Sequence, residues 1–505
     1  MSITGPGSIT AANVAAQTNM MQQLDMLGQE LGTGQAAQTY SQLGSQAGVA
    51  VALGAQLSDI NGYTSTANTI GTTLTIEQSV LGQLNSAGTT VAQSVEQQGG
   101  FSLNNTGQTN MQVSAASYLN QIVAFLNTQA GGNYLFSGSA VNQPSVVSSN
   151  EILNGNGSQA GLTQLIAERQ QADLGTGQMG RLTVAVTGAG SNDVTVSQDG
   201  SPFGFQLASV TSNLTGATVN QPSGSPPSLS VDLGSNPNNG DSIQFNLTLP
   251  DGSSQTITLQ ATTNATPGTN QFTIGSSASA TAANLQTALQ TSLSNLAQTA
   301  LPAASAIAAA NDFFEVPPQI VDPRSAPNYA AATSLVTGTS ANTVMWYTGE
   351  NGGTPALQTA TAQVGPSITV DYGMRATEPA ITSLLANVAA LAATTFSASN
   401  PNAQASYVAL SQSVVGSLSG QPGTQTISDM QADIANAQTM VTNATQFNTQ
   451  TQSTLQDMLQ GIEGINENQI GENLLTLQNN LSASMAVTAR LAQLSLVNFL
   501  GSVAG

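Results

Sequence analysis

The sequence has no cysteine, no histidine and no lysine among its 505 residues. Without cysteine there is no disulfide, thiolate metal site or cysteine nucleophile. Without histidine there is no Ser-His-Asp triad and no histidine-ligated metal. Without lysine there is neither a Schiff base nor a Walker lysine. These absences exclude most enzyme classes, and we expect no catalytic residue, no cofactor and no bound metal.

Charge is also scarce. Charged residues make up 6% of the chain, where about 25% is ordinary. Five arginines stand against 25 acidic residues, which gives a net charge of −20. Contact with phosphates requires clustered Lys and Arg, so we expect no nucleic-acid partner. Anionic membrane surfaces are disfavoured for the same reason.

Nothing in the sequence resembles a Sec-type signal peptide or a membrane span. Residues 1–6 have neither a basic region nor an apolar core. No apolar run approaches the ~18 residues that a spanning helix needs. We therefore expect no membrane insertion and no cleaved signal.

The two ends of the chain carry the spacing of long, mutually packed helices. Apolar residues alternate at three and four positions, the heptad spacing of helices that pack on one another. In the first zone, about 10 to 170, they are Ile60, Tyr63, Ala67, Ile70, Leu74, Leu81 and Leu84, with Glu77 as the one break. In the last zone, about 378 to 505, the spacing runs from Ile427 to Ile465 with a polar slot at Asn448. We expect the two ends to pack against each other.

The middle of the chain, about 175 to 375, carries strand patterns. Ile243, Phe245, Leu247 and Leu249 alternate with polar residues, the period of a half-buried strand. Residues 250–252 read Pro-Asp-Gly, a turn signal, and a returning strand follows. Further strands are expected around 182–186 and 229–233, and a helix over Thr281 to Thr299. Trp346 is expected in the core.

These zones predict an α+β protein: a discontinuous helical-bundle domain, made of the N- and C-terminal ends as long coiled-coil-like helices, with a β-rich α+β insert domain. The predicted segments are 1–45, an N-terminal polymerisation helix; 46–175, the first part of the bundle; 176–375, the surface-exposed insert; 376–469, the second part of the bundle; and 470–505, a C-terminal polymerisation helix.

Two patterns could indicate chemistry, and both have a simpler interpretation. Residues Gly175 to Gly180 match G-x-G-x-x-G, but they follow an expected helix and precede a strand, the reverse of a dinucleotide site. We interpret them as a flexible connector. Asp251 and Glu315 could form a glycosidase-like pair, but nothing in the sequence brings them together.

The C-terminus is strongly apolar. Leu491, Leu494, Leu496, Val497, Phe499 and Leu500 crowd one helix end. An isolated monomer would expose this patch, and such patches usually mark interfaces. The alternative is that it docks on its own chain. A head-to-tail contact that does not close generates a helical filament.

Three segments resemble the bacterial flagellin superfamily, of alphaproteobacterial type. Residues 477–484 and 488–500 resemble the terminal helix of the family. Leu24 to Leu31, followed by Gly32-Thr33-Gly34, resembles its "LSSG" region, and residues 132–138, Gly-Asn-Tyr-Leu-Phe-Ser-Gly, are similar to a motif of the hook–filament junction members. The stretch with residues 272–275 and 306–314 resembles an insert domain of some alphaproteobacterial flagellins.

The resemblance implies a non-enzymatic structural subunit of the flagellar filament, extracellular and secreted without a cleaved signal, that polymerises for motility. Its expected interface residues are Leu24, Leu27, Leu31, Leu474, Leu477, Leu481, Leu491, Leu494, Leu496, Phe499 and Leu500. Its implied partners are further copies in a helical homopolymer, hook-associated and filament-cap proteins, the flagellar type III export apparatus and an export chaperone. The alternative is the hook–filament junction protein.

Two features depart from the family pattern. The Asp-Asp-Ala segment expected after "LSSG" is replaced by Ala36-Ala37-Gln38. The stretch from Leu81 to Gln97 has no arginine, so recognition by innate immune receptors is not expected. A second class of function, an adhesin-like or carbohydrate-binding module in the Asn/Ser/Thr-rich insert, stays open.

Overall fold

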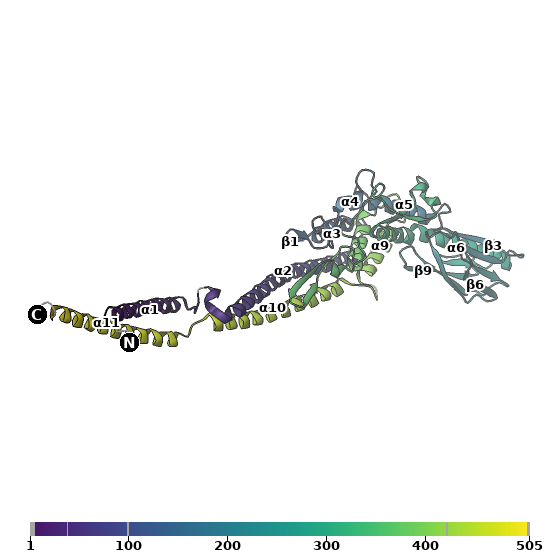
Figure 1. The fold of residues 1–505 in the computed structure, drawn as a ribbon. Coiled ribbons are helices and arrows are strands. Elements are labelled where there is room, and N and C mark those ends of the chain that lie inside the picture. Colours follow the sequence, from purple (N-terminus) through teal and green to yellow (C-terminus); the bar gives the residue numbers. More distant parts are fainter. Residues whose placement is uncertain (1–5, 38, 98–99, 421–422, 502–505) are drawn as a thin grey trace. The chain divides into compact units, whose positions relative to one another are not determined.

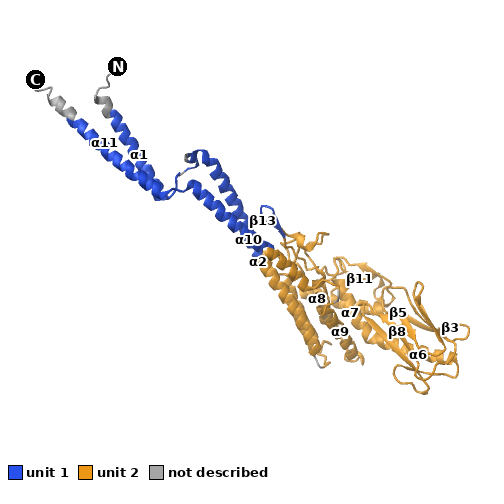
Figure 2. Cartoon of the chain, turned by 90° about the horizontal axis from the view of Figure 1, so that it is seen from below, with its two compact units in different colours: residues 1–71, 362–370, 440–505 blue, residues 72–361, 371–439 orange. Residues whose placement is uncertain are grey.

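The computed structural model describes residues 6–37, 39–97, 100–420 and 423–501, without the side chains of residues 6–10, 42 and 494–501. The chain mixes helices and sheets, 54% helix and 17% strand, which is compatible with the predicted α+β class. It forms two compact units (Figure 2). Unit 1 comprises residues 1–71, 362–370 and 440–505, and unit 2 comprises 72–361 and 371–439.

Unit 1 is built mainly from long helices. Its elements are α1 (Pro6–Thr33), η1 (Tyr40–Gln46), the first part of α2 (Ala47–Gln97), most of the hairpin of β13 (Thr361–Gly365) and β14 (Ile368–Asp371), the second part of α10 (Ile427–Glu463), and α11 (Glu467–Gly501). Leu53 and Ile60 of α2 are buried in one apolar cluster with Leu455 of α10. At these positions the heptad spacing corresponds to packing between α2 and α10.

The polar slot in the α10 seam has a structural role. Asn448 is fully buried, and its Nδ2 donates to the backbone oxygen of Val364 in β13 at 2.8 Å. The amide thus fixes the β13–β14 hairpin on α10, because a buried donor is costly unless it finds an acceptor.

Unit 2 contains all other elements. Its helices are the rest of α2, α3 (Asn110–Leu126), α4 (Ser149–Asn154), α5 (Leu162–Leu174), α6 (Ala278–Gln298), α7 (Ala300–Phe313), α8 (Pro379–Ala393), α9 (Ala403–Leu418) and the start of α10, with the short turns η2 (Pro323–Ser325), η3 (Tyr329–Ala331) and η4 (Ala356–Thr359). Two-stranded sheets join β1 (Gln129–Ala130) to β2 (Asn133–Tyr134) and β11 (Gln319–Val321) to β12 (Leu335–Thr337).

Two four-stranded sheets share one core with α6 (Figure 1). One has the order β3-β4-β7-β6, with β3 (Leu182–Thr187), β4 (Asp193–Gln198), β6 (Ala217–Ser223) and β7 (Ser228–Leu233). The other has the order β10-β9-β8-β5, with β5 (Gln206–Ser212), β8 (Ser242–Thr248), β9 (Ser254–Thr262) and β10 (Gln271–Thr273). Alternate side chains of both sheets point into this core, as their period of two requires.

Several predictions for this part are confirmed. β8 and β9 form the predicted hairpin, with Phe245 opposite Ile257 in an antiparallel register. The predicted helix over 281–299 is α6, and its Leu285, Leu289 and Leu293 are buried. Trp346 is fully buried, with its Nε1 donating to the backbone oxygen of Glu315 at 3.1 Å.

The glycine string at 175–180 connects α5 to β3, as interpreted, and its last member is closely packed. Gly180 has φ +61°, and a Cβ added there would lie 2.3 Å from Cδ2 of Phe205. Gly180 oxygen also accepts from the Phe205 N–H at 2.9 Å. This end of the connector is therefore fixed against the sheet core.

We expect Gly180→Ala to lower the free energy of unfolding of unit 2 by at least about 2 kcal/mol. The left-handed backbone costs an L residue about 1–2 kcal/mol, and the Phe205 ring must also move. Gly177→Ala is the matched control, since nothing lies within 4 Å of its added Cβ; we expect a change below about 0.5 kcal/mol. Urea unfolding followed by circular dichroism compares them. Equal effects of the two substitutions would contradict this account.

Candidate assembly surface

The two terminal helices pack side by side and antiparallel (Figure 1). At one end, the N–H of Ala36 donates to the oxygen of Glu463 at 2.7 Å. Toward the other end, Gln17 Nε2 donates to Thr488 Oγ1 at 2.9 Å and to Ser484 Oγ at 3.3 Å. Residue numbers rise along α1 while those of the facing α11 residues fall, so the pairing is antiparallel.

A heptad seam joins the two helices. On α11 the side chains that are not exposed recur at alternate steps of four and three: Ile470, Leu474, Leu477, Leu481, Ser484, Thr488 and Leu491. On α1 the half-buried positions are Asn13, Gln17, Met20, Leu24, Leu27 and Glu30. Apart from Ile470, these seam side chains are only half-buried, because two helices alone cover one stripe of each other.

The structure therefore places the expected interface residues in two groups. Leu24, Leu27, Leu474, Leu477, Leu481 and Leu491 lie in the seam within the chain, whereas Leu31 is 44% exposed. The side chains of Leu494, Leu496, Phe499 and Leu500 lie outside the described residues. A shallow groove of about 380 Å³ runs beside the seam, lined by Met26, Leu27 and Leu477 among others.

The remaining surface of unit 1 is unusually apolar. Among the residues whose side chains are described, thirteen of the fifteen large apolar side chains that are exposed belong to unit 1, which has under a third of the chain. They are Val14, Met21, Met26, Leu31, Tyr40, Val49, Val51, Met440, Phe447, Met458, Leu475, Met485 and Val487; the two in unit 2 are Val113 and Val408. We call the thirteen the exposed apolar set.

Sequence reasoning missed most of the exposed apolar set. It selected heptad positions of the long helices and the leucines implied by the family resemblance, and Met21, Met26 and Leu475 are not among them. The available signal was that these helices carry apolar residues on more than one face. A helix that is apolar on several faces is normally covered on several faces.

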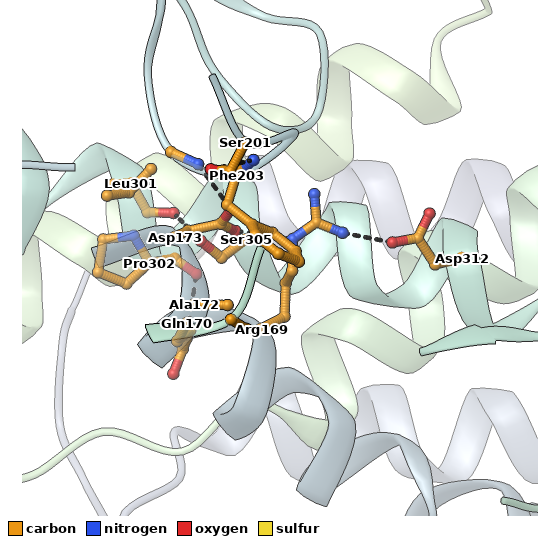
Figure 3. A network of polar contacts seen from close by, with 12 residues as sticks. Arg169, Gln170, Ala172, Asp173, Ser201, Phe203, Leu301, Pro302, Ser305 and Asp312 are labelled. Carbon is orange, nitrogen blue, oxygen red and sulfur yellow. Dashed lines mark hydrogen bonds and ion pairs between the residues drawn. The ribbon is translucent and has the colours of Figure 1, made fainter. Parts of the chain in front are cut away.

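Unit 2 contains a partly buried charge network around Arg169 and Arg181 (Figure 3 shows the part around Arg169). Arg169 Nε donates to Asp173 Oδ2 at 3.0 Å, and its Nη1 pairs with Asp312. Two guanidiniums lie over the ring of Phe203, with Arg169 Cζ at 5.1 Å and Arg181 Cζ at 5.3 Å from its centroid. The network joins α5 to α7 and to the loop before β5.

Asp173, one of the carboxylates in this network, is enclosed by the protein. Asp173 is fully buried and accepts from the Arg169 side chain and, at 2.8 Å, from the N–H of Gly204. Burial raises the pKa of Asp173, and Arg169 partly offsets this effect. With its acceptors occupied and no exposure, Asp173 is unsuited to proton transfer with a substrate.

The glycosidase-like pair is not assembled. Asp251 lies in the turn between β8 and β9 and accepts from the N–H and hydroxyl of Ser253. Glu315 follows α7 and acts electrostatically on Asp312 instead. These two carboxylates are therefore engaged at different places in unit 2.

Asp312 gives unit 2 a pH-dependent stability. Burial raises its pKa from 3.8 to about 6; Arg169 lowers it, and Glu315 and Asp173 raise it. The folded state therefore holds this proton more tightly than the unfolded chain, so stability falls as pH rises from about 4 to about 6. Two pKa units correspond to on the order of 2–3 kcal/mol.

We expect Asp312→Asn to flatten this dependence. Urea midpoints of the two proteins at pH 4, 5, 6 and 7 measure the effect, and the substitution keeps the side chain's size. The comparison with the variant is needed because repulsion among the ionising carboxyls of a chain with a net charge of −20 also lowers stability as pH rises. An unchanged slope in the variant would exclude Asp312 as its source.

Comparisons with known proteins add no assignment. No protein-family model matches the chain, and no curated protein matches it significantly. Within the described ranges, no group of His, Cys, Asp and Glu side chains could hold a metal ion. In the same part of the chain, every helix is too short or too polar to cross a membrane.

Proposed function

We propose that the chain is a structural subunit of the bacterial flagellar filament and polymerises through its terminal helices. One observation carries the proposal: the exposed apolar set is concentrated in unit 1, which holds both chain ends. The resemblance of residues 477–500 to the terminal helix of flagellins supports the same assignment.

The magnitude of the apolar burial favours an assembly with several neighbours. Full burial of a Leu, Val or Met side chain contributes roughly 1.5–3 kcal/mol, so a half-exposed one contributes about 1 kcal/mol when it is covered. Thirteen such side chains give on the order of 10 kcal/mol, comparable with the 4–15 kcal/mol that association costs. They lie on four α-helices and on η1, and on several faces, so one partner surface cannot cover them all.

The proposal includes a finer architecture. The two ends of the chain would form one discontinuous, coiled-coil-like helical domain that faces other subunits, and the β-rich segment would be the exposed insert. In this proposal the subunit acts outside the cell, after export through the flagellar type III apparatus with a chaperone, and meets hook-associated and cap proteins at the filament ends. It has no catalytic role.

The hook–filament junction protein is the second candidate, on account of residues 132–138. Leu135, Phe136 and Ser137 of this segment are buried. Gly138 N–H donates to Met374 oxygen at 3.0 Å, and Phe136 oxygen accepts from Ala376 N–H at 2.9 Å. The segment thus holds unit 2 together, so it supports shared ancestry more than a particular position in the flagellum.

Electron microscopy of the purified chain, after salt-induced polymerisation with filament seeds, tests the proposal. Long filaments, with thousands of copies in native filaments, are the expected result. A few copies at the filament base and no elongation would favour the junction protein. No association with flagella would overturn both.

A further inference from the structure

The α1–α11 pair has charge of one sign at one end and of the other sign toward the opposite end. Asp25 and Glu30 lie near the end of α1, beside the start of α11 with Glu467 and Glu472. Residues 6–24 of α1 and 473–501 of α11 contain no acidic residue and one base, Arg490. The helix pair is therefore acidic at one end and basic toward the other.

Arg490 has no ion pair among the described residues. The other four arginines pair with Asp173 and Asp312, Asp199, Asp322 and Glu350 respectively. Arg490 is exposed on α11, as is Asp25 on α1.

Arg490 cannot reach an acidic residue of its own helix pair. Gln17 contacts Thr488, so Arg490 lies level with about residue 15 of α1. Asp25 is then about ten residues, or about 15 Å, further along the axis. Glu472 on the same helix is about 27 Å away at 1.5 Å per residue. Both distances exceed the reach of an arginine side chain for a direct ion pair.

We infer that Arg490 pairs with Asp25 of a second copy, when the outer face of α11 packs on the outer face of α1 of that copy. The inference rests on the proposed function and names a contact of the same surface. It requires parallel copies displaced by about 15 Å along the helix axis. Because different faces of the two copies meet, the contact is head-to-tail and can repeat without closing.

Asp25 fits this contact better than the other acidic residues do. It is the exposed carboxylate of α1, whereas Glu30 is a half-buried member of the seam. The α1 face of Asp25 carries the exposed Met21 four residues before it, and the α11 face of Arg490 carries the exposed Val487 three residues before it. Covering these faces would remove water from Arg490, and an uncompensated charge in such a contact strongly opposes association.

The ion pair would set the polarity and axial register of the assembly. Contacts between apolar faces are similar in many axial registers, whereas an ion pair stabilises one register and like charges destabilise others. Reversing the direction of one copy would leave Arg490 opposite an uncharged segment of the helix pair. Because these helices carry so few charges, a single charged position can select the axial register.

Seeded elongation at low ionic strength tests the inference. We expect Arg490→Glu to raise the critical concentration about tenfold or more, and the double variant Arg490→Glu with Asp25→Arg to recover it. Arg490→Glu with Glu472→Arg has the same net charge and should not recover. Arg324→Glu, an exposed arginine of unit 2, should elongate as the wild type does. Circular dichroism checks that helix content is unchanged.

Each outcome decides a separate point. If the wild type elongates and Arg490→Glu elongates equally well, the ion pair is overturned while the proposed function stands. Recovery by the Glu472 swap instead of the Asp25 swap, or by neither, overturns the assignment of Asp25. If the wild type itself neither elongates nor associates, the proposed function and the inference fall together.

Discussion

A chain that ends at Arg490 is expected to lose polymerisation completely and to keep unit 2 folded. The deletion removes Leu491, the last residue of the α1–α11 seam whose side chain the structure describes, and the apolar residues that follow it in the sequence. Unit 2 contains no residue beyond 439 and has its own sheet core. The truncation therefore removes the assembly surface without touching that core. Seeded elongation, followed by electron microscopy, and urea unfolding measure the two expectations.

Paired substitutions give this prediction a matched control. Met26→Ser with Leu475→Ser removes two members of the exposed apolar set, and Val113→Ser with Val408→Ser removes the two exposed apolar side chains of unit 2. Only the first pair should slow elongation, because the second lies outside the proposed surface. A truncated chain that still forms filaments, or equal slowing by both pairs, would refute the assignment of the surface to unit 1.

Local patterns predicted the elements whose partners are near in sequence. The β8–β9 hairpin follows from alternation around a Pro-Asp-Gly turn, and α6 follows from leucines at 285, 289 and 293. The long terminal helices follow from the heptad spacing. In each case the period of the apolar residues is sustained along the element, and for the hairpin a turn signal agrees with it, which favours a reliable prediction.

The partners of those elements could not be predicted. The order β3-β4-β7-β6 beside β10-β9-β8-β5 depends on which strands share the core with α6, and no local period encodes that choice.

The burial of Glu77 was also not predicted. The heptad spacing marked it as a break, whereas the structure buries it, and burial raises its pKa well above the ordinary value.

The candidate assembly surface was predicted only in part, because local spacing does not show which residues are left exposed after the helices pack. The heptad spacing predicted that the two ends of the chain pack against each other, whereas the resemblance to flagellins assigned the seam leucines to contacts between copies. The structure uses Leu24, Leu27 and Leu477 within the chain. The exposed apolar side chains outside the seam, such as Met21 and Leu475, could be identified only once the seam was known. The residues of an assembly surface are those left exposed after packing within the chain, so identifying them requires the three-dimensional structure.

Arg169→Met is expected to destabilise unit 2 by about 3–5 kcal/mol, the usual cost of removing one partner of a buried ion pair. Methionine keeps much of the apolar stem beside Phe203. It leaves Asp173, which is fully buried, without its counter-ion. Asp312 loses the same guanidinium, so its pKa should rise further and the fall of stability with pH should extend to higher pH.

Two further variants separate lost charge pairing from lost packing. Arg324 is also paired with an aspartate, but its side chain is 84% exposed, so Arg324→Met should cost less than about 1 kcal/mol. Asp173→Asn in the Arg169→Met background removes the uncompensated carboxylate and should restore part of the stability. Urea unfolding at pH 7 compares all three. If Arg169→Met costs no more than Arg324→Met, the charge network does not hold α5 to α7, and the direct packing of these two helices must do so instead.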